Sequence, residues 1–149
     1  MRMTAGQIIA RGLRTYGVEH LVGLPGHGNW SMLDALHDDG CDLDFVQVFH
    51  EQSAVHVADA FYRASGRLAA CTTSIGPGAL NAVMGLGTAY ADSTATVLFT
   101  GGPATHMRGH GVMQELDRGG SSDFPRLVTS VTKRSYEVFR ADEIPFVLH

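Results

Sequence analysis

Residues 43–78 read LDFVQVFHEQSAVHVADAFYRASGRLAACTTSIGPG, and this stretch decides the fold. Its first part, Leu43 to Phe49, has the character of a strand. From Glu51 to Ser65 apolar side chains recur at helical spacing, and Gly66 follows as a helix stop. A second strand-like run, Leu68 to Thr73, leads into a Gly-Pro-Gly turn. This succession of strand, helix and strand predicts a parallel βαβ unit.

The same alternation extends in both directions along the chain. Thr4 and Gln7 have the spacing of a capping box, which predicts a helix that stops at Gly17. After the central unit, a helix over Ala79–Tyr90 leads to a strand over Ala95–Thr100. The remaining elements are a strand over His20–Leu24, a turn over Pro25–Gly28 and a helix capped by Asn29. Strands that alternate with helices on short connections predict a three-layer, doubly wound α/β fold, with a mainly parallel sheet and helices on both faces.

The pattern weakens after the last of these strands. Short strands are expected at Leu127–Val131 and Ser135–Phe139, and Asp142 is expected to cap a final helix. That helix has only begun when the sequence stops at His149, whereas a doubly wound domain would return to the sheet. We therefore expect residues 1–149 to form one incomplete domain, either a fragment or a subunit that a partner completes.

The composition excludes two kinds of partner. The net charge is −4 and basic residues are not clustered, which leaves no electrostatic footprint for nucleic acid or an anionic membrane surface. No apolar stretch approaches the roughly 18 residues of a membrane span, and the N-terminal residues lack the apolar segment of a signal peptide. We therefore expect a cytoplasmic location, with Cys41 and Cys71 as reduced thiols.

Four loops follow the predicted strands, and we expect them to meet at the edge of the sheet where parallel α/β proteins bind ligands. They are residues 23–28, His50-Glu51, Ser74–Gly78 and the chain from Gly101 onward. Taken alone, Glu51 has an ordinary interpretation as a helix-start carboxylate stabilised by the helix dipole. The Ser74–Gly78 turn is either a phosphate cradle or a tight connection between strand and helix. His106 and His110 lack helical periodicity and a third ligand, so no metal site is expected.

A series of segments resembles, in order, the N-terminal pyrimidine-binding domain of acetolactate-synthase-like enzymes that depend on thiamine diphosphate. The segments are Gly23-Leu24-Pro25-Gly26 with Leu33-Asp34-Ala35-Leu36, His50-Glu51-Gln52-Ser53-Ala54, Ala58 to Gly66, Thr73 to Asn81, Ala89 to Ser93, and Met113-Gln114-Glu115. No single segment is decisive, but together they cover nearly the whole chain. The resemblance implies the fold of that domain and an enzyme that acts on 2-oxo acids.

The resemblance also implies roles for individual residues. Glu51 would hydrogen-bond N1′ of the aminopyrimidine of thiamine diphosphate and favour the imino tautomer that removes the C2 proton. His27 and Gln114 would lie on the substrate side of the site. Contacts with the cofactor are implied for Pro25, Gly26, Ser74, Gly76, Pro77, Gly78 and Asn81.

The family's second domain, which holds the diphosphate and its Mg²⁺, is expected to be missing. Its mark is Gly-Asp-Gly followed by a distant Asn, and this chain does not contain that pattern. The resemblance then implies an active site shared with a diphosphate-binding domain or subunit of the same enzyme, in a homo-oligomer that is at least a dimer. The chain by itself is not expected to be active.

The implied reaction is acetolactate-synthase-like carboligation, by a transferase or lyase. Two alternatives stay open, a subunit of a decarboxylase acting on another 2-oxo acid and a non-catalytic α/β assembly module. A dinucleotide-binding domain is disfavoured because the spacing of Gly23, Gly26 and Gly28 does not match G-x-G-x-x-G.

Overall fold

The computed structural model describes residues 3–37, 41–117 and 123–149. In this part of the chain the strands form one parallel sheet in the order β2-β1-β3-β4. They are β1 (His20–Gly23), β2 (Asp44–Gln47), β3 (Ala70–Thr73) and β4 (Val97–Thr100). In the register, Val22 pairs with Val46 on one side and with Cys71 on the other. Each strand lies inside its predicted range, and the predicted parallel sheet is confirmed.

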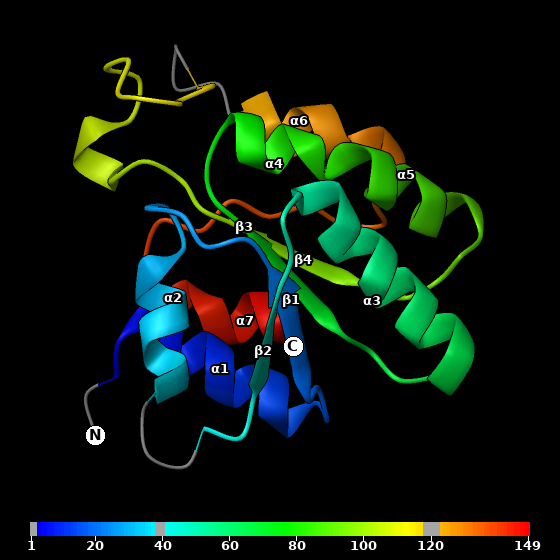
Figure 1. The fold of residues 1–149 in the computed structure, drawn as a ribbon. Helices are drawn as coiled ribbons and strands as arrows, with labels where there is room; N and C mark the ends of the chain where they lie inside the picture. The colour runs from blue at the N-terminus through cyan, green and yellow to red at the C-terminus, as the bar shows by residue number, and fades with distance from the viewer. Residues whose placement is uncertain (1–2, 38–40, 118–122) are drawn as a thin grey trace.

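Helices cover both faces of this sheet (Figure 1). They are α1 (Ala5–Thr15), α2 (Trp30–Asp34), α3 (Glu51–Ser65), α4 (Pro77–Asn81), α5 (Val83–Ala91), α6 (Asp123–Val128) and α7 (Ile144–Leu148), with 3-10 turns at Ala35–His37, Thr105–Met107, Thr129–Val131 and Ala141–Glu143. Helices α1, α2 and α7 lie on one side of the strands and α3 to α6 on the other. Among the described residues no helix has the length and apolar character needed to cross a membrane.

The strands divide their side chains between two hydrophobic cores. Leu21 and Ala70 belong to the core under α1, whereas their neighbours Val22 and Cys71 belong to the core under α3. Successive residues of a strand point to opposite faces, so an apolar run of this kind serves both layers at once. This explains why the central strands β1 and β3 are buried at nearly every position, whereas the edge strand β2 is mostly exposed.

Close packing of α3 against α5 depends on Gly85. A Cβ atom added there would lie 2.6 Å from Cβ of Val55, which is closer than side chains can approach. The glycine therefore lets the two helices touch along the sheet. Because α3 begins at Glu51, this contact also fixes where that residue lies relative to α4 and α5.

Helix boundaries follow the predicted local signals. Thr4 and Gln7 form the expected capping box at α1, with Thr4 N donating to Gln7 Oε1 over 2.8 Å. Gly17 has φ +76° just beyond that helix. Gly66 has φ +70° at the end of α3 and donates its N–H to Tyr62 O over 2.8 Å. These interactions are local in sequence, which is why the sequence predicts them.

The predicted helix over Ala79–Tyr90 is two helices. The first, α4, begins earlier than expected because Pro77 occupies its first turn, where a missing N–H is harmless. It ends at Asn81, and α5 starts at Val83 after the buried Ala82. The division leaves Asn81 at the end of a short helix.

Both strands predicted near the C-terminus are wrong. Leu127–Val131 is the end of α6 and a following 3-10 turn, in which Thr129 and Thr132 donate side-chain hydrogen bonds to the carbonyls of Pro125 and Val128. A short apolar run fits a helix or a strand equally well, and here only Val128 is buried in the core. Ser135–Phe139 has no regular structure.

The predicted capping role of Asp142 is also wrong. Its carboxylate receives both hydrogen bonds of the Arg140 guanidinium, at 2.9 and 2.7 Å. The neighbouring Glu143 accepts the backbone N–H groups of Phe139 and Arg140 instead. Either acid could serve as a cap on sequence grounds, and the competing arginine decides between them.

A buried carboxylate ties α3 to the turn before β4. Asp59 is 5% exposed and accepts hydrogen bonds from Thr94 Oγ1 and from Arg63 Nε. Arg63 also pairs with Asp92 at 2.6 Å. Burial alone would raise the pKa of Asp59, but the hydrogen bonds from Thr94 and Arg63 outweigh it, and the pKa is lowered.

We expect Asp59→Asn to lower the free energy of unfolding at pH 7 by roughly 1–3 kcal/mol, because a hydrogen-bonded charge is lost. The pKa of Asp59 is lower in the folded state than its ordinary value of 3.8. Its contribution to the free energy of unfolding is therefore complete above pH 3.8 and is lost as the pH falls through the lowered pKa. Urea unfolding between pH 7 and pH 3 should therefore show wild type and variant converging in acid. The control is Asp92→Asn, which removes the exposed carboxylate that also pairs with Arg63. It should lower the free energy of unfolding by about 1 kcal/mol or less. A difference that stays constant down to pH 3 would contradict this account.

Candidate active site

The loops after β1 and β3 meet at the carboxyl ends of the strands, as predicted. Gly28 N donates to Ser74 Oγ over 3.3 Å. A Cβ atom added to Gly26 would lie 2.5 Å from Cβ of Ser74, so the first loop crosses directly over the third. Gly101, after β4, packs against the backbone of Gly28. These three loops therefore touch one another at this edge of the sheet, and the fourth, His50-Glu51, joins them where Glu51 packs against Gly78.

Asn29 holds the first loop in place, a role that the sequence analysis missed. Its side chain is 3% exposed, and Oδ1 accepts the N–H of Gly26 over 2.9 Å. Its Nδ2 donates to Leu24 O at 3.1 Å and to Thr72 Oγ1 at 3.2 Å. An asparagine before a helix ordinarily predicts a cap, but Asn29 makes no side-chain capping bond to α2. Its actual partners lie in the turn before it and in a strand distant in sequence.

Glu51 is the buried acid of this region. It is the first residue of α3 and 8% exposed. Asn81 Nδ2, at the end of α4, donates to Glu51 Oε2 over 2.9 Å. The helix start favours a negative charge, and the amide fixes the direction of the carboxylate. The position of Glu51 is therefore compatible with an ordinary carboxylate at a helix start. The hydrogen bond from Asn81 also fixes the orientation of the carboxylate, which stabilisation of a helix start does not need.

The second oxygen of that carboxylate packs closely against Gly78. A Cβ atom added to Gly78 would lie 2.9 Å from Glu51 Oε1 and 3.8 Å from Cβ of Ser74. Any other residue at position 78 would cover the acid. One oxygen of Glu51 is thus bound by Asn81, and the other packs against a residue that has no side chain.

The turn into α4 is possible only with glycine at position 76. Gly76 has φ +58° and ψ −119°, a conformation that other residues avoid. An added Cβ would lie 1.8 Å from the carbonyl oxygen of Gln114, so the turn is packed against the later loop. Pro77 follows at the first helical position and is exposed. The predicted phosphate cradle is not needed to explain this turn, since close backbone packing already requires its glycines.

The remaining predicted residues lie at the surface of the same edge. Pro25, His27 and Gln114 are exposed, and Gly26 is half-buried. His106 and His110 are exposed on the loop that carries Gln114. Within the described residues, no group of three or more His, Cys, Asp or Glu side chains is arranged to hold a metal ion.

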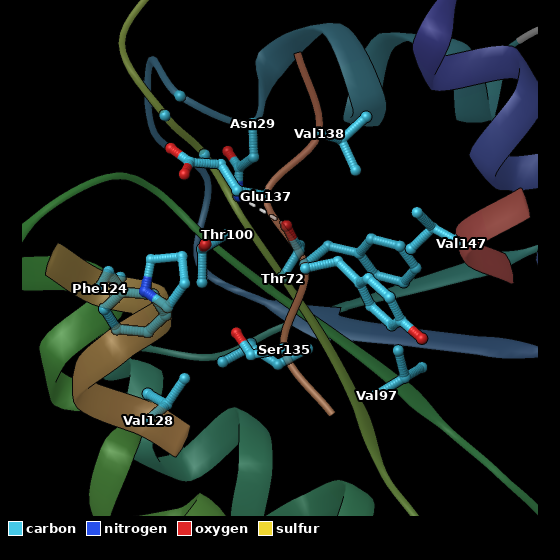
Figure 2. A pocket seen from close by; sticks show the side chains of 18 of the residues that line it. Asn29, Thr72, Val97, Thr100, Phe124, Val128, Ser135, Glu137, Val138 and Val147 are labelled. Carbon is cyan, nitrogen blue, oxygen red and sulfur yellow. Dashed lines mark hydrogen bonds between the residues drawn. The ribbon is translucent and has the colours of Figure 1, made fainter. Parts of the chain in front are cut away.

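A cavity of about 1620 Å³ borders this region on the side of β4. Figure 2 shows its walls, with Phe124 and Val128 on one side, Val147 on another, and Ser135, Glu137 and Val138 in the segment that crosses between them. Gly76 and Gln114 belong to its lining, whereas Glu51 does not. The cavity and the carboxylate are thus two neighbouring features that share the Gly76 turn.

A parallel α/β sheet with loops gathered over a buried, oriented carboxylate defines a ligand-binding α/β domain. The chain belongs to the family described as thiamine pyrophosphate enzyme, N-terminal TPP binding domain, whose family model matches residues 3–121. This confirms the resemblance found in the sequence.

Several curated relatives are acetolactate synthase subunits. The chain is 40% identical over 149 residues to the acetolactate synthase isozyme 3 large subunit of Escherichia coli K12, covering 99% of this chain and 25% of that protein. It is 38% identical over 143 residues to the probable large subunit of Methanocaldococcus jannaschii, covering 96% and 23%. For the large subunit of Haemophilus influenzae the identity is 35% over 147 residues, covering 99% and 24%. The chain thus spans about a quarter of the length of these relatives.

Proposed function

We propose that this chain binds the aminopyrimidine half of thiamine diphosphate in an acetolactate-synthase-like carboligase, a transferase acting on 2-oxo acids, and that Glu51 activates the cofactor. The observation that carries the proposal is the Glu51 carboxylate, buried at a helix start with one oxygen bound to Asn81 and the other beside Gly78. An acid that served only to start the helix would not need the orientation that Asn81 imposes on it.

The residues present fit the aminopyrimidine. Glu51 offers a directed acceptor for a ring N–H, and glycine at position 78 keeps side-chain atoms away from its second oxygen. Gly76 and Pro77 shape the neighbouring backbone, and Pro25, Gly26 and Ser74 form the opposite loop. In this assignment these residues and Asn81 contact the cofactor.

Thiamine diphosphate held by these residues would supply a nucleophilic carbon for chemistry on 2-oxo acids. The chain's own contribution is that Glu51 holds a proton between its carboxylate and N1′ of the pyrimidine. General acid–base catalysis requires these two groups to be within hydrogen-bond distance of each other. Asn81 keeps the carboxylate in that direction. His27 and Gln114, both exposed at this edge, are proposed to face the substrate.

The diphosphate and Mg²⁺ are assigned to another domain or subunit of the same enzyme, in at least a homodimer. The short coverage of the relatives supports this, since most of their length lies outside the matched region. It also follows that this chain alone binds the cofactor weakly, because a diphosphate anchor contributes charge-assisted bonds that the pyrimidine cannot replace.

The test uses the full-length protein that contains this chain, with pyruvate, thiamine diphosphate and Mg²⁺. Carboligation converts two pyruvate molecules to one acetolactate and one CO₂, and we expect acetolactate as the cofactor-dependent product. Acetaldehyde with CO₂ as the only products would favour the decarboxylase alternative. Absence of cofactor binding by isothermal titration would favour the non-catalytic module.

A further inference from the structure

Glu115 is a buried carboxylate that the proposed chemistry does not use. It is 6% exposed and lies in the loop between β4 and α6. Three backbone N–H groups donate to it, from Gly109, from Gly111 at 2.8 Å and from Val112 at 3.2 Å. The bond from Gly109 is the main cause of a lowered pKa, with further lowering from Gly111 and Val112. The carboxylate is therefore charged at neutral pH and organises the turn around it.

This turn holds Gln114 in an unusual backbone conformation. Gln114 has φ +65°, and Ser93 is the only other non-glycine residue with positive φ in the described chain. Such a conformation is strained for a residue with a side chain and persists only where surrounding bonds impose it. Glu115 supplies those bonds, because its side chain and its own N–H, which donates to Val112 O over 3.1 Å, close the turn on both sides of Gln114.

The strained residue packs directly against the site. The Gln114 carbonyl oxygen occupies the place where a Cβ of Gly76 would be, 1.8 Å from the ideal position. Gly76 in turn lies two residues before Gly78, which packs against the carboxylate of Glu51. A shift of Gln114 therefore reaches the turn that borders the buried acid.

A second set of contacts anchors the outer part of the loop without Glu115. Arg108 pairs with Asp117 and, at 2.8 Å, with Glu137, and its guanidinium lies 4.9 Å from the centre of the Phe139 ring. These contacts join the loop to the segment that lines the cavity. The Arg108 contacts therefore attach the loop to the rest of the domain independently of Glu115. Glu115 determines only the conformation of the turn at Gln114.

We propose that Glu115 is a positioning residue, whose carboxylate fixes the 109–115 turn and thereby holds Gln114 against Gly76 at the edge of the site. The proposal rests on the proposed function for its kinetic consequence, because Gln114 is assigned there to the substrate side. Its structural consequence, coupling between the 109–115 turn and the Gly76 turn, does not depend on that assignment.

The test uses the full-length protein with Glu115→Gln and Glu115→Ala. The control is Glu143→Gln, another carboxylate that accepts two backbone N–H groups, those of Phe139 and Arg140. In both Glu115 variants, amide hydrogen exchange measured without cofactor should become faster in the peptides that cover residues 109–115 and 74–80. In the control variant, neither peptide should exchange faster than in the wild type. Protection of 74–80 that is unchanged while 109–115 loosens would overturn the proposal, whether or not the protein has activity.

The kinetic arm separates positioning from mere stability. With pyruvate, we expect kcat/KM of Glu115→Gln to fall by about tenfold to a hundredfold, mostly through KM, because misplacing a substrate-side group weakens catalysis by that order. In a Gln114→Ala background the same change should have little further effect, since Glu115 acts through Gln114. Additive losses in the double variant would overturn the proposal. A wild-type protein inactive on every 2-oxo acid would instead count against the proposed function, and the exchange result would still decide the role of Glu115.

Discussion

Replacement of Glu51 by glutamine in the full-length enzyme is expected to slow hydrogen–deuterium exchange at C2 of bound thiamine diphosphate by ~10²–10⁴-fold, the usual range of a general acid–base contribution. The amide is nearly isosteric and can still accept from Asn81, so packing should change little. It carries no negative charge, however, and cannot stabilise a proton shared with the pyrimidine. Quenched-flow NMR of the exchange in wild type and variant measures this directly.

The control addresses the helix-start interpretation of Glu51. Asp123→Asn removes another first-turn carboxylate, at α6, and should affect only stability, by about 0.3–1 kcal/mol. Cofactor affinity of Glu51→Gln should fall far less than the exchange rate, because the diphosphate anchor is elsewhere. Equal exchange rates in wild type and Glu51→Gln would reduce Glu51 to an ordinary helix-start acid.

Replacement of Gly76 by alanine is expected to lower the free energy of unfolding by roughly 2–5 kcal/mol, from backbone strain and a steric clash together. The strain arises because φ is +58°, and the clash because the new Cβ would meet the Gln114 carbonyl at 1.8 Å. To relieve it, the 109–115 turn must move away from the site. Urea unfolding measures the loss of stability, and weaker cofactor binding in the full-length protein would accompany it.

Gly66→Ala separates the two contributions. Gly66 has φ +70°, but nothing lies within 4 Å of an added Cβ, so only the left-handed strain of about 1–2 kcal/mol applies. The difference between the two variants contains the steric clash at Gly76 together with the additional strain of its ψ of −119°. Equal losses would show that the Gln114 loop yields freely and that its packing against Gly76 is not important.

Local patterns accounted for most of the fold. The α1 capping box, the glycine stops and the apolar strands all act over a few residues, so the sequence reveals them without knowledge of distant partners. The same rules failed at Leu127–Val131, where a short apolar run carries no period long enough to distinguish helix from strand. They also failed at Asp142, where Arg140 engages the expected capping group.

By itself the sequence determined the class of fold, the family, and the position of Glu51 at the start of a helix after a buried strand. These follow from periodicity, turn residues and ordered motifs along one chain. Only the tertiary structure decided how the acid is held. The bond from Asn81, the brace at Asn29, and the packing of Gln114 on Gly76 join residues far apart in sequence. Such contacts depend on how helices and loops pack across the sheet, which no local pattern specifies.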